Sequence, residues 1–108
     1  MKTETIERPA VAITPYREVV DARLQAIKDR ERELERDGVA DHYRKMFNKS
    51  VGDAASKGNV VAQIVFEAAH RDELTINCLR LLIEGDIKQA GYTLRDNVLN
   101  NSITVVLY

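Results

Sequence analysis

The last seven residues of the chain, Ser102–Tyr108, form its most β-prone run. Most of them are β-branched, and such side chains pack well on a pleated sheet. Side chains alternate between the two faces of a strand. Because none of these seven residues is charged, neither face of the predicted strand carries a charge. An uncharged strand of this kind is predicted inside a sheet rather than at its edge. The two faces are Ile103, Val105 and Leu107 on one side, and Thr104, Val106 and Tyr108 on the other.

The longest amphipathic stretch predicts a helix from Pro15 to about Arg36. Thr14 is its predicted N-cap, Pro15 its first helical residue and Gly38 its C′ residue. Apolar positions recur along it at helical spacing on a narrow stripe, which Glu31 interrupts. We take these positions as the candidate protein interface: Tyr16, Val19, Val20, Leu24, Ile27 and Leu34.

The second half of this helix, Lys28–Asp37, is nearly all charge of alternating sign, which is typical of a solvated helix surface held by pairs of side chains one turn apart. A narrow stripe with this much charge fits two arrangements. The helix either packs on a partner helix or lies across the surface of its own domain. Residues 1–13 lack periodicity and contain Pro9, so they predict an extended arm, which is either a loose tail or a contact to a neighbouring subunit.

Residues Val39–Lys57 predict a second amphipathic helix, with a wider apolar stripe and Gly58 as its C-terminal stop. Its polar face is modestly basic and lies next to His42. This face is either solvated or a contact to phosphate groups of nucleic acid. The cations on it are Arg44, Lys45, Lys49 and Lys57.

The rest of the chain predicts a strand, a helix and two strands. Residues Asn59–Glu67 are rich in β-branched side chains, which favours a strand, although a helix stays open for residues 60–67. Asp72 caps a strongly apolar helix that ends at Ala90, before Gly91. A short strand, Tyr92–Arg95, and a turn-rich segment, Asp96–Asn101, lead to the closing strand.

The predicted fold is therefore α+β, in the order α-α-β-α-β-β, with a small three-stranded mixed sheet. The strand–helix–strand unit brings its two strands parallel. The closing strand runs antiparallel to the strand before it and lies between the other two. The domain organisation is an arm at 1–13, a long interaction helix at 14–37 and a compact α+β domain at 38–108.

The closing strand needs cover on both faces. The helix from Asp72 to Ala90 is apolar enough to cover one of them, and Val39–Lys57 is the best candidate for the other. If that second helix packs elsewhere, we expect the face of Thr104, Val106 and Tyr108 to become an interface.

Length, charge and cysteine content narrow the class of protein. A chain of 108 residues is long enough for one core but not for two. The formal net charge of −1 gives no global electrostatic case for nucleic acid or anionic membrane. The single Cys78 lies in an apolar helix and is expected to be a small buried hydrophobe in a reducing compartment. With neither a membrane-spanning run nor a secretory signal in view, we expect a cytoplasmic protein or one assembled into something larger.

No motif of the sequence indicates catalysis, a metal site or a cofactor. His42 and His70 are far apart and lack a second ligand at a recognised spacing. Phosphate-binding glycine loops and nucleophile motifs are missing. Helix caps and solvated faces account for most of the acidic residues considered for paired catalysis. These residues are Asp53, Glu67, Asp72, Glu73, Glu84 and Asp86.

The stretch from Leu81 to Tyr108 resembles the closing unit of small proteins that tailed bacteriophages encode. It has an apolar helix that ends in Ala90-Gly91-Tyr92, the short strand Thr93-Leu94, and the β-branched run Ile103–Tyr108. The segment Ala54–Gly58, placed before a strand, resembles the same layout. The resemblance implies a virion component or a factor that acts in the host bacterial cytoplasm, and it names no active residues.

These observations support three hypotheses. The first is a non-enzymatic phage-type structural or assembly protein, which acts by homo-oligomerisation or by contacts with other phage proteins. The second is a nucleic-acid-binding accessory protein that uses the basic face of helix 39–57. The third is a small-ligand or enzyme function in a cleft between subunits.

Overall fold

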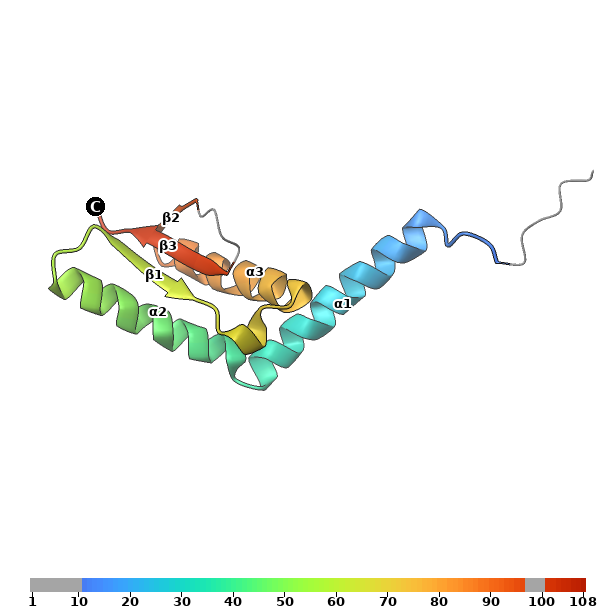
Figure 1. Cartoon of the computed structure of the whole chain (residues 1–108), viewed down its shortest axis with the longest axis horizontal. Helices are drawn as coiled ribbons and strands as arrows, with labels where there is room; N and C mark the ends of the chain where they lie inside the picture. The colour runs from blue at the N-terminus through green and yellow to red at the C-terminus, as the bar shows by residue number, and fades with distance from the viewer. Residues whose placement is uncertain (1–10, 97–100) are drawn as a thin grey trace, which may run out of the picture.

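The computed structural model describes residues 11–96 and 101–108. Within them the order of elements is α1 (Tyr16–Arg36), α2 (Val39–Ser56), β1 (Val61–Val65), the 3-10 turn η1 (Ala68–His70), α3 (Glu73–Gln89), β2 (Thr93–Arg95) and β3 (Ser102–Val106) (Figure 1). This confirms the predicted α+β class and element order. It also settles residues 61–65 as strand rather than helix.

The sheet is antiparallel throughout, in the order β1-β3-β2. The closing strand is central, as its uncharged faces predict. The prediction of a mixed sheet is wrong, and the reason lies in this placement. The outer strands β1 and β2 run in the same direction, but β3 separates them, so no parallel ladder forms.

Helix α3 packs on one face of the sheet, and α2 runs alongside β1 on the side away from β3, with its apolar side turned to the same core (Figure 1). Ala62 and Ile64 of β1 lie opposite Val105 and Ile103 of β3 on this covered face, and all four are buried. The helices contribute Tyr43 and Phe47 from α2, and Leu79, Ile83 and Ile87 from α3, to the same core.

The prediction that the second helix covers the opposite face of β3 is therefore wrong, because α2 packs beside α3. The residues of that opposite face differ in exposure, and their role as an interface stays a prediction. Tyr108 is exposed, but Thr104 is buried in register with Gln63 and Arg95 of the two flanking strands.

The ends of the helices follow local sequence signals. Gly38 and Gly91 adopt the positive φ angles that close α1 and α3, a conformation that other residues rarely adopt. The side chain of Asp72 accepts a hydrogen bond from the backbone N–H of Thr75, which confirms the predicted cap. At the start of α1 the prediction is one residue early. Pro15 rather than Thr14 is the N-cap, and its carbonyl accepts from Glu18 and Val19.

Two predicted segments lie partly outside the described residues. Of the arm at 1–13, the structure describes residues 11–13, which are exposed. Of the connection Asp96–Asn101, it describes Asp96 and Asn101. Over the described parts of the chain, none of the helices has the length and apolar character needed to span a bilayer.

Candidate functional site

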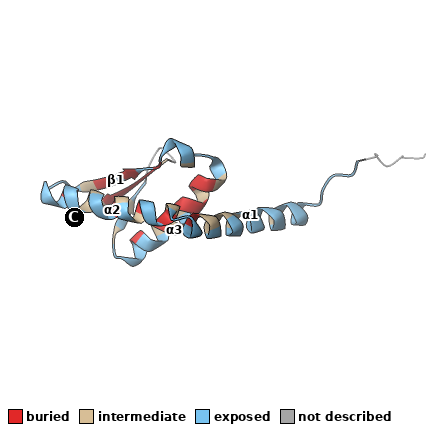
Figure 2. Ribbon diagram, turned by 90° about the horizontal axis from the view of Figure 1, so that it is seen from below, coloured by how far each residue is buried: buried red, intermediate tan, exposed pale blue. Residues whose placement is uncertain are grey.

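The helix α1 divides into two parts with different surroundings. We call Tyr16–Leu24 the projecting half and Gln25–Arg36 the docked half. Figure 1 shows the projecting half running out from the body of the protein, and Figure 2 shows that exposed residues dominate it. Contact between α1 and α3 begins near Arg23, which borders a small cleft with Glu73, Leu74 and Asn77 of α3.

The docked half is held by a few apolar positions. Leu34 is only 4% exposed and belongs to the core, and Ile27 packs against that core. The backbone carbonyl of Ile27 lies 3.6 Å from the Sγ of Cys78 in α3. Cys78 is fully buried, as expected, and burial raises the pKa of its thiol, so the residue is not an activated nucleophile.

The projecting half presents large apolar side chains to solvent. Tyr16 is 82% exposed, Val19 52% and Leu24 49%, while Val20 is half-buried. Of the six residues predicted to form a protein interface, the structure thus places four in the projecting half. Of the remaining two, Leu34 belongs to the protein's own core and Ile27 packs against it.

Arg44, the first cation of the predicted basic face, is the centre of an ion-pair cluster. Its guanidinium binds both oxygens of Glu35 in α1 at 2.6 and 2.8 Å, Asp41 at 2.7 Å and Asp86 of α3 at 2.7 Å. These carboxylates, Glu35 above all, raise the pKa of Arg44. The residue therefore joins α1, α2 and α3, and a phosphate group would have to displace its carboxylate partners to bind it.

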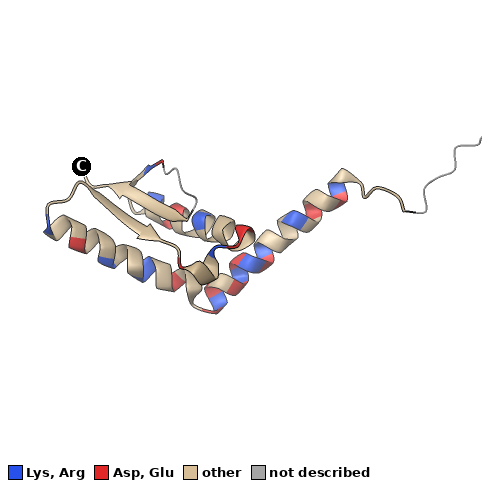
Figure 3. Cartoon of the chain, viewed as in Figure 1, with Lys and Arg blue, Asp and Glu red and all other residues tan. Residues whose placement is uncertain are grey.

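The other three cations of this face differ in their surroundings. Lys49 forms an ion pair of 2.9 Å with Asp53, one turn further along α2, while Lys45 and Lys57 are exposed. The pKa of Asp53 is lowered chiefly by this bond to Lys49. Figure 3 shows acidic residues interspersed with the basic ones along α2, so its surface alternates in sign rather than forming a continuous basic stripe.

A polar cluster that sequence reasoning missed surrounds the buried hydroxyl of Tyr43. The backbone N–H of Glu67 donates to this hydroxyl at 2.8 Å, and the hydroxyl lies 2.7 Å from Nδ1 of His70. His42 binds the carboxylate of Glu67 at 2.9 Å. Because the hydroxyl oxygen already accepts from Glu67, its proton can be donated to His70.

This cluster fixes the connection between β1 and α3 onto α2. Arg71 adds a bond from its Nε to the carbonyl of Phe66, and the ring of Phe66 packs edge-on against Tyr43. The rings of His42 and His70, distant in sequence, both pack edge-on against the ring of Tyr43. The sequence contains little sign of this polar cluster, because Tyr43 occupies an apolar position of its helix and Glu67 follows a strand. Among the described residues, no group of three or more His, Cys, Asp or Glu side chains is placed to hold a metal ion.

A cleft of about 440 Å³ lies between α2 and α3. Its walls are apolar and include Phe47, Ile83, Ile87 and Tyr92, with Arg44 and Asp86 at one side. Both charged groups are engaged with each other, so this cleft offers packing surface rather than a pair of groups poised for acid–base chemistry. Comparison of the chain with protein-family models, curated proteins and solved structures found no match.

Proposed function

We propose that this chain is a non-enzymatic assembly protein that forms homo-oligomers, and that the projecting half of α1 is one of its contact surfaces. The observation that carries the proposal is the exposure of Tyr16, Val19 and Leu24 on a helix whose other half is anchored in the core. A cluster of exposed apolar side chains on one element is typical of a protein-binding surface.

The anchoring of the docked half gives the projecting half a defined direction. A helix of nine residues is marginal by itself in water, whereas one that continues a docked helix needs no new nucleus. The projecting half is thus preorganised, which lowers the entropic cost of binding. Fully burying an exposed leucine is worth roughly 1.5–3 kcal/mol, and Leu24, which is 49% exposed, would gain about half of that.

The resemblance of the closing unit to proteins of tailed bacteriophages supplies a biological setting for this proposal. We propose that the assembly belongs to a virion or works in the cytoplasm of the host bacterium, where its partners are further copies or other phage proteins. In this setting the described α+β body carries α1, which is the element that reaches a neighbour.

The test is the mass of the protein in solution, measured by light scattering behind gel filtration. Deleting residues 1–37 is too coarse, because it also removes Leu34 from the core. The double variant Val20→Glu/Leu24→Glu places charges in the projecting half and leaves the docked half intact. We expect it to lower the mass relative to the unaltered chain.

Leu81→Glu is the matched control. It is combined with Thr93→Glu at an exposed position of β2, so that the control adds the same two negative charges as the double variant; Leu81 itself is 61% exposed on α3. We expect the control to keep the mass of the unaltered chain. The proposal fails if the double variant and the control have the same mass.

A further inference from the structure

The cleft between α2 and α3 has walls that suit an aromatic side chain. Its volume is about 440 Å³, and the rings of Phe47 and Tyr92 line it. These two rings pack edge-on, with their centroids 5.1 Å apart and an angle of 89° between their planes. A further ring can pack against such a pair in the offset or edge-on arrangements that aromatic rings prefer. Asn48 and Ala90 also line the cleft and are exposed, so a group can enter it from solvent.

One side of this cleft carries an excess of negative charge. Arg44 and Asp86 line that side, and the guanidinium of Arg44 also binds the carboxylates of Glu35 and Asp41. Three carboxylates thus surround one guanidinium, and their side chains are 45–64% exposed. A group that enters the cleft beside them is therefore favoured if it brings positive charge and an atom that can form a hydrogen bond.

The tip of the projecting half, Tyr16 and Arg17, has the complementary properties. Tyr16 is the first residue of α1 and is 82% exposed, and its apolar ring ends in a hydroxyl. Arg17 adds a positive charge, and the N-terminus of a helix carries a partial positive charge as well. Glu18 is the acidic residue of this turn. Because successive residues of a helix lie about 100° apart, Glu18 lies on the side of α1 opposite Tyr16.

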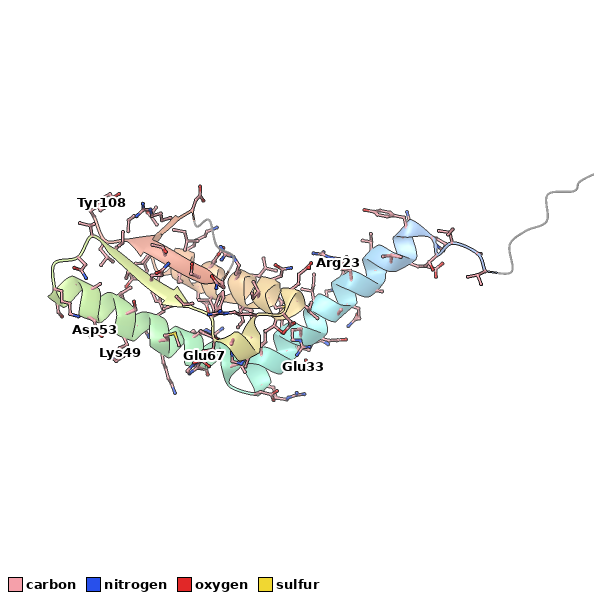
Figure 4. The ribbon with its side chains drawn as sticks, in the orientation of Figure 1. Arg23, Glu33, Lys49, Asp53, Glu67 and Tyr108 are labelled. Atoms are coloured by element: carbon pink, nitrogen blue, oxygen red, sulfur yellow. The ribbon has the colours of Figure 1, made fainter. Side chains whose placement is uncertain are left out.

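The tip of one chain cannot reach the cleft of the same chain. Figure 4 shows Arg23 of α1 at one end of the body, and Lys49 and Asp53 of α2 toward the other end. The cleft lies beside Asn48, next to that part of α2. From Arg23 the helix continues away from the body for about 10 Å before it reaches Tyr16. A contact between tip and cleft therefore needs two copies.

We propose that the tip of α1 from a second copy binds in the cleft between α2 and α3. The ring of its Tyr16 packs on Phe47 and Tyr92, and its Arg17 lies beside the carboxylates around Arg44. The contact rests on the proposed function, because it uses the projecting half of α1, and it adds the surface that receives this half. Each copy offers one tip and one cleft, so copies join head to tail rather than about a two-fold axis.

The experiment separates the tip from the cleft with one variant of each, made in the full chain. Tyr16→Ala removes the ring that enters, and an aromatic ring that fills a pocket is a common centre of binding energy. Ala90→Trp fills the cleft from α3. Light scattering behind gel filtration should give each variant the mass of a monomer.

Two matched controls make the same changes elsewhere. Tyr108→Ala removes a tyrosine that is 89% exposed, and Ala55→Trp enlarges an exposed alanine of α2 that does not line the cleft. Both controls should keep the mass of the unaltered chain, and circular dichroism of all variants should agree.

An equimolar mixture of Tyr16→Ala and Ala90→Trp tests the head-to-tail contact directly. The open cleft of the first variant can receive the tyrosine of the second, and no further copy can add to this pair. The mixture should therefore have twice the mass of either variant alone, which misfolded chains would not give. Asn48→Trp fills the cleft from α2 and should replace Ala90→Trp in the mixture.

A mixture that stays monomeric with both tryptophan variants overturns the proposal. So does an Ala90→Trp variant with the mass of the unaltered chain, which would leave the cleft to a different protein or to a small apolar molecule. If this contact fails while the proposed function holds, Val20→Glu/Leu24→Glu lowers the mass and Ala90→Trp does not. If the proposed function fails too, Val20→Glu/Leu24→Glu also leaves the mass unchanged.

Discussion

The burial of the two halves of α1 is the opposite of what their compositions suggest. The docked half is dense in charge of both signs, and Figure 3 shows these charges along its surface. The projecting half holds most of the large apolar residues of the helix, yet it is the half in solvent. Burial in this helix is therefore decided by position rather than by average polarity.

The physical reason lies in how few contacts a docked helix needs. Leu34 fills a place in the core and Ile27 packs at its border. Between them Lys28, Asp29 and Arg32 are exposed, while Arg30 and Glu31 are half-buried. Arg30 pairs locally with Glu33, at 3.2 Å. The bond of Glu35 to Arg44 adds a polar contact to α2. The projecting half extends past the start of α3; its last turn still borders α3 at Arg23, whereas Tyr16 and Val19 are exposed.

The largest effect that would test this comparison comes from truncating leucine in each half. Leu34→Ala should lower the free energy of unfolding by roughly 2–5 kcal/mol, because it removes buried contacts and leaves a cavity. Leu24→Ala should change it by less than about 0.5 kcal/mol in the monomer. Urea unfolding of both variants in the dilute protein measures the difference. Equal losses would show that the projecting half is packed in the monomer as well.

A second and smaller effect concerns Asp72, which caps the helix that receives the docked half. The hydrogen bonds from Thr75 lower the pKa of Asp72, so its carboxylate stabilises the fold. That contribution is full above the ordinary pKa of about 4 and is lost as the pH falls through the lowered value. Asp72→Ala should cost about 0.5–2 kcal/mol near pH 7.

The difference between Asp72→Ala and the unaltered chain should shrink below about pH 4, where the ordinary carboxyl is protonated. Asp72→Asn is the matched control, since an amide oxygen also caps a helix but does not titrate. It should keep most of the stability at neutral pH. A loss for Asp72→Ala that is the same at pH 7 and at pH 3 would contradict the role of the charge.

Sequence predicted the elements well because their ends depend on local signals. Gly38, Gly91 and Asp72 mark helix boundaries through φ angles and caps that involve only neighbouring residues. The uncharged faces of the closing strand were enough to place it at the centre of the sheet. The prediction of a mixed sheet was wrong although this placement was right, because β3 in the centre makes both ladders antiparallel and the shared direction of β1 and β2 produces no ladder.

The surroundings of the candidate site could be predicted only in part, because they depend on contacts distant in sequence. Arg44 was assigned to a basic face, but the carboxylates of Glu35 and Asp86 reach it from two other helices. The apolar stripe of α1 was predicted to be one continuous interface. Its division into an exposed part and a part packed on the core depends on where α3 lies.

The smallest expected effect comes from charge, and it tests whether the docked half is held by ion pairs as well as by Leu34. Glu35→Gln removes the carboxylate that binds Arg44, while Asp41 and Asp86 still pair with the guanidinium. These groups are partly exposed, so the loss should be only about 0.5–1 kcal/mol. High salt should reduce it further, because salt screens exposed charges.

Asp21→Asn in the projecting half is the control and should have no measurable effect. If both variants change stability equally and independently of salt, the docked half owes its position to apolar contacts alone.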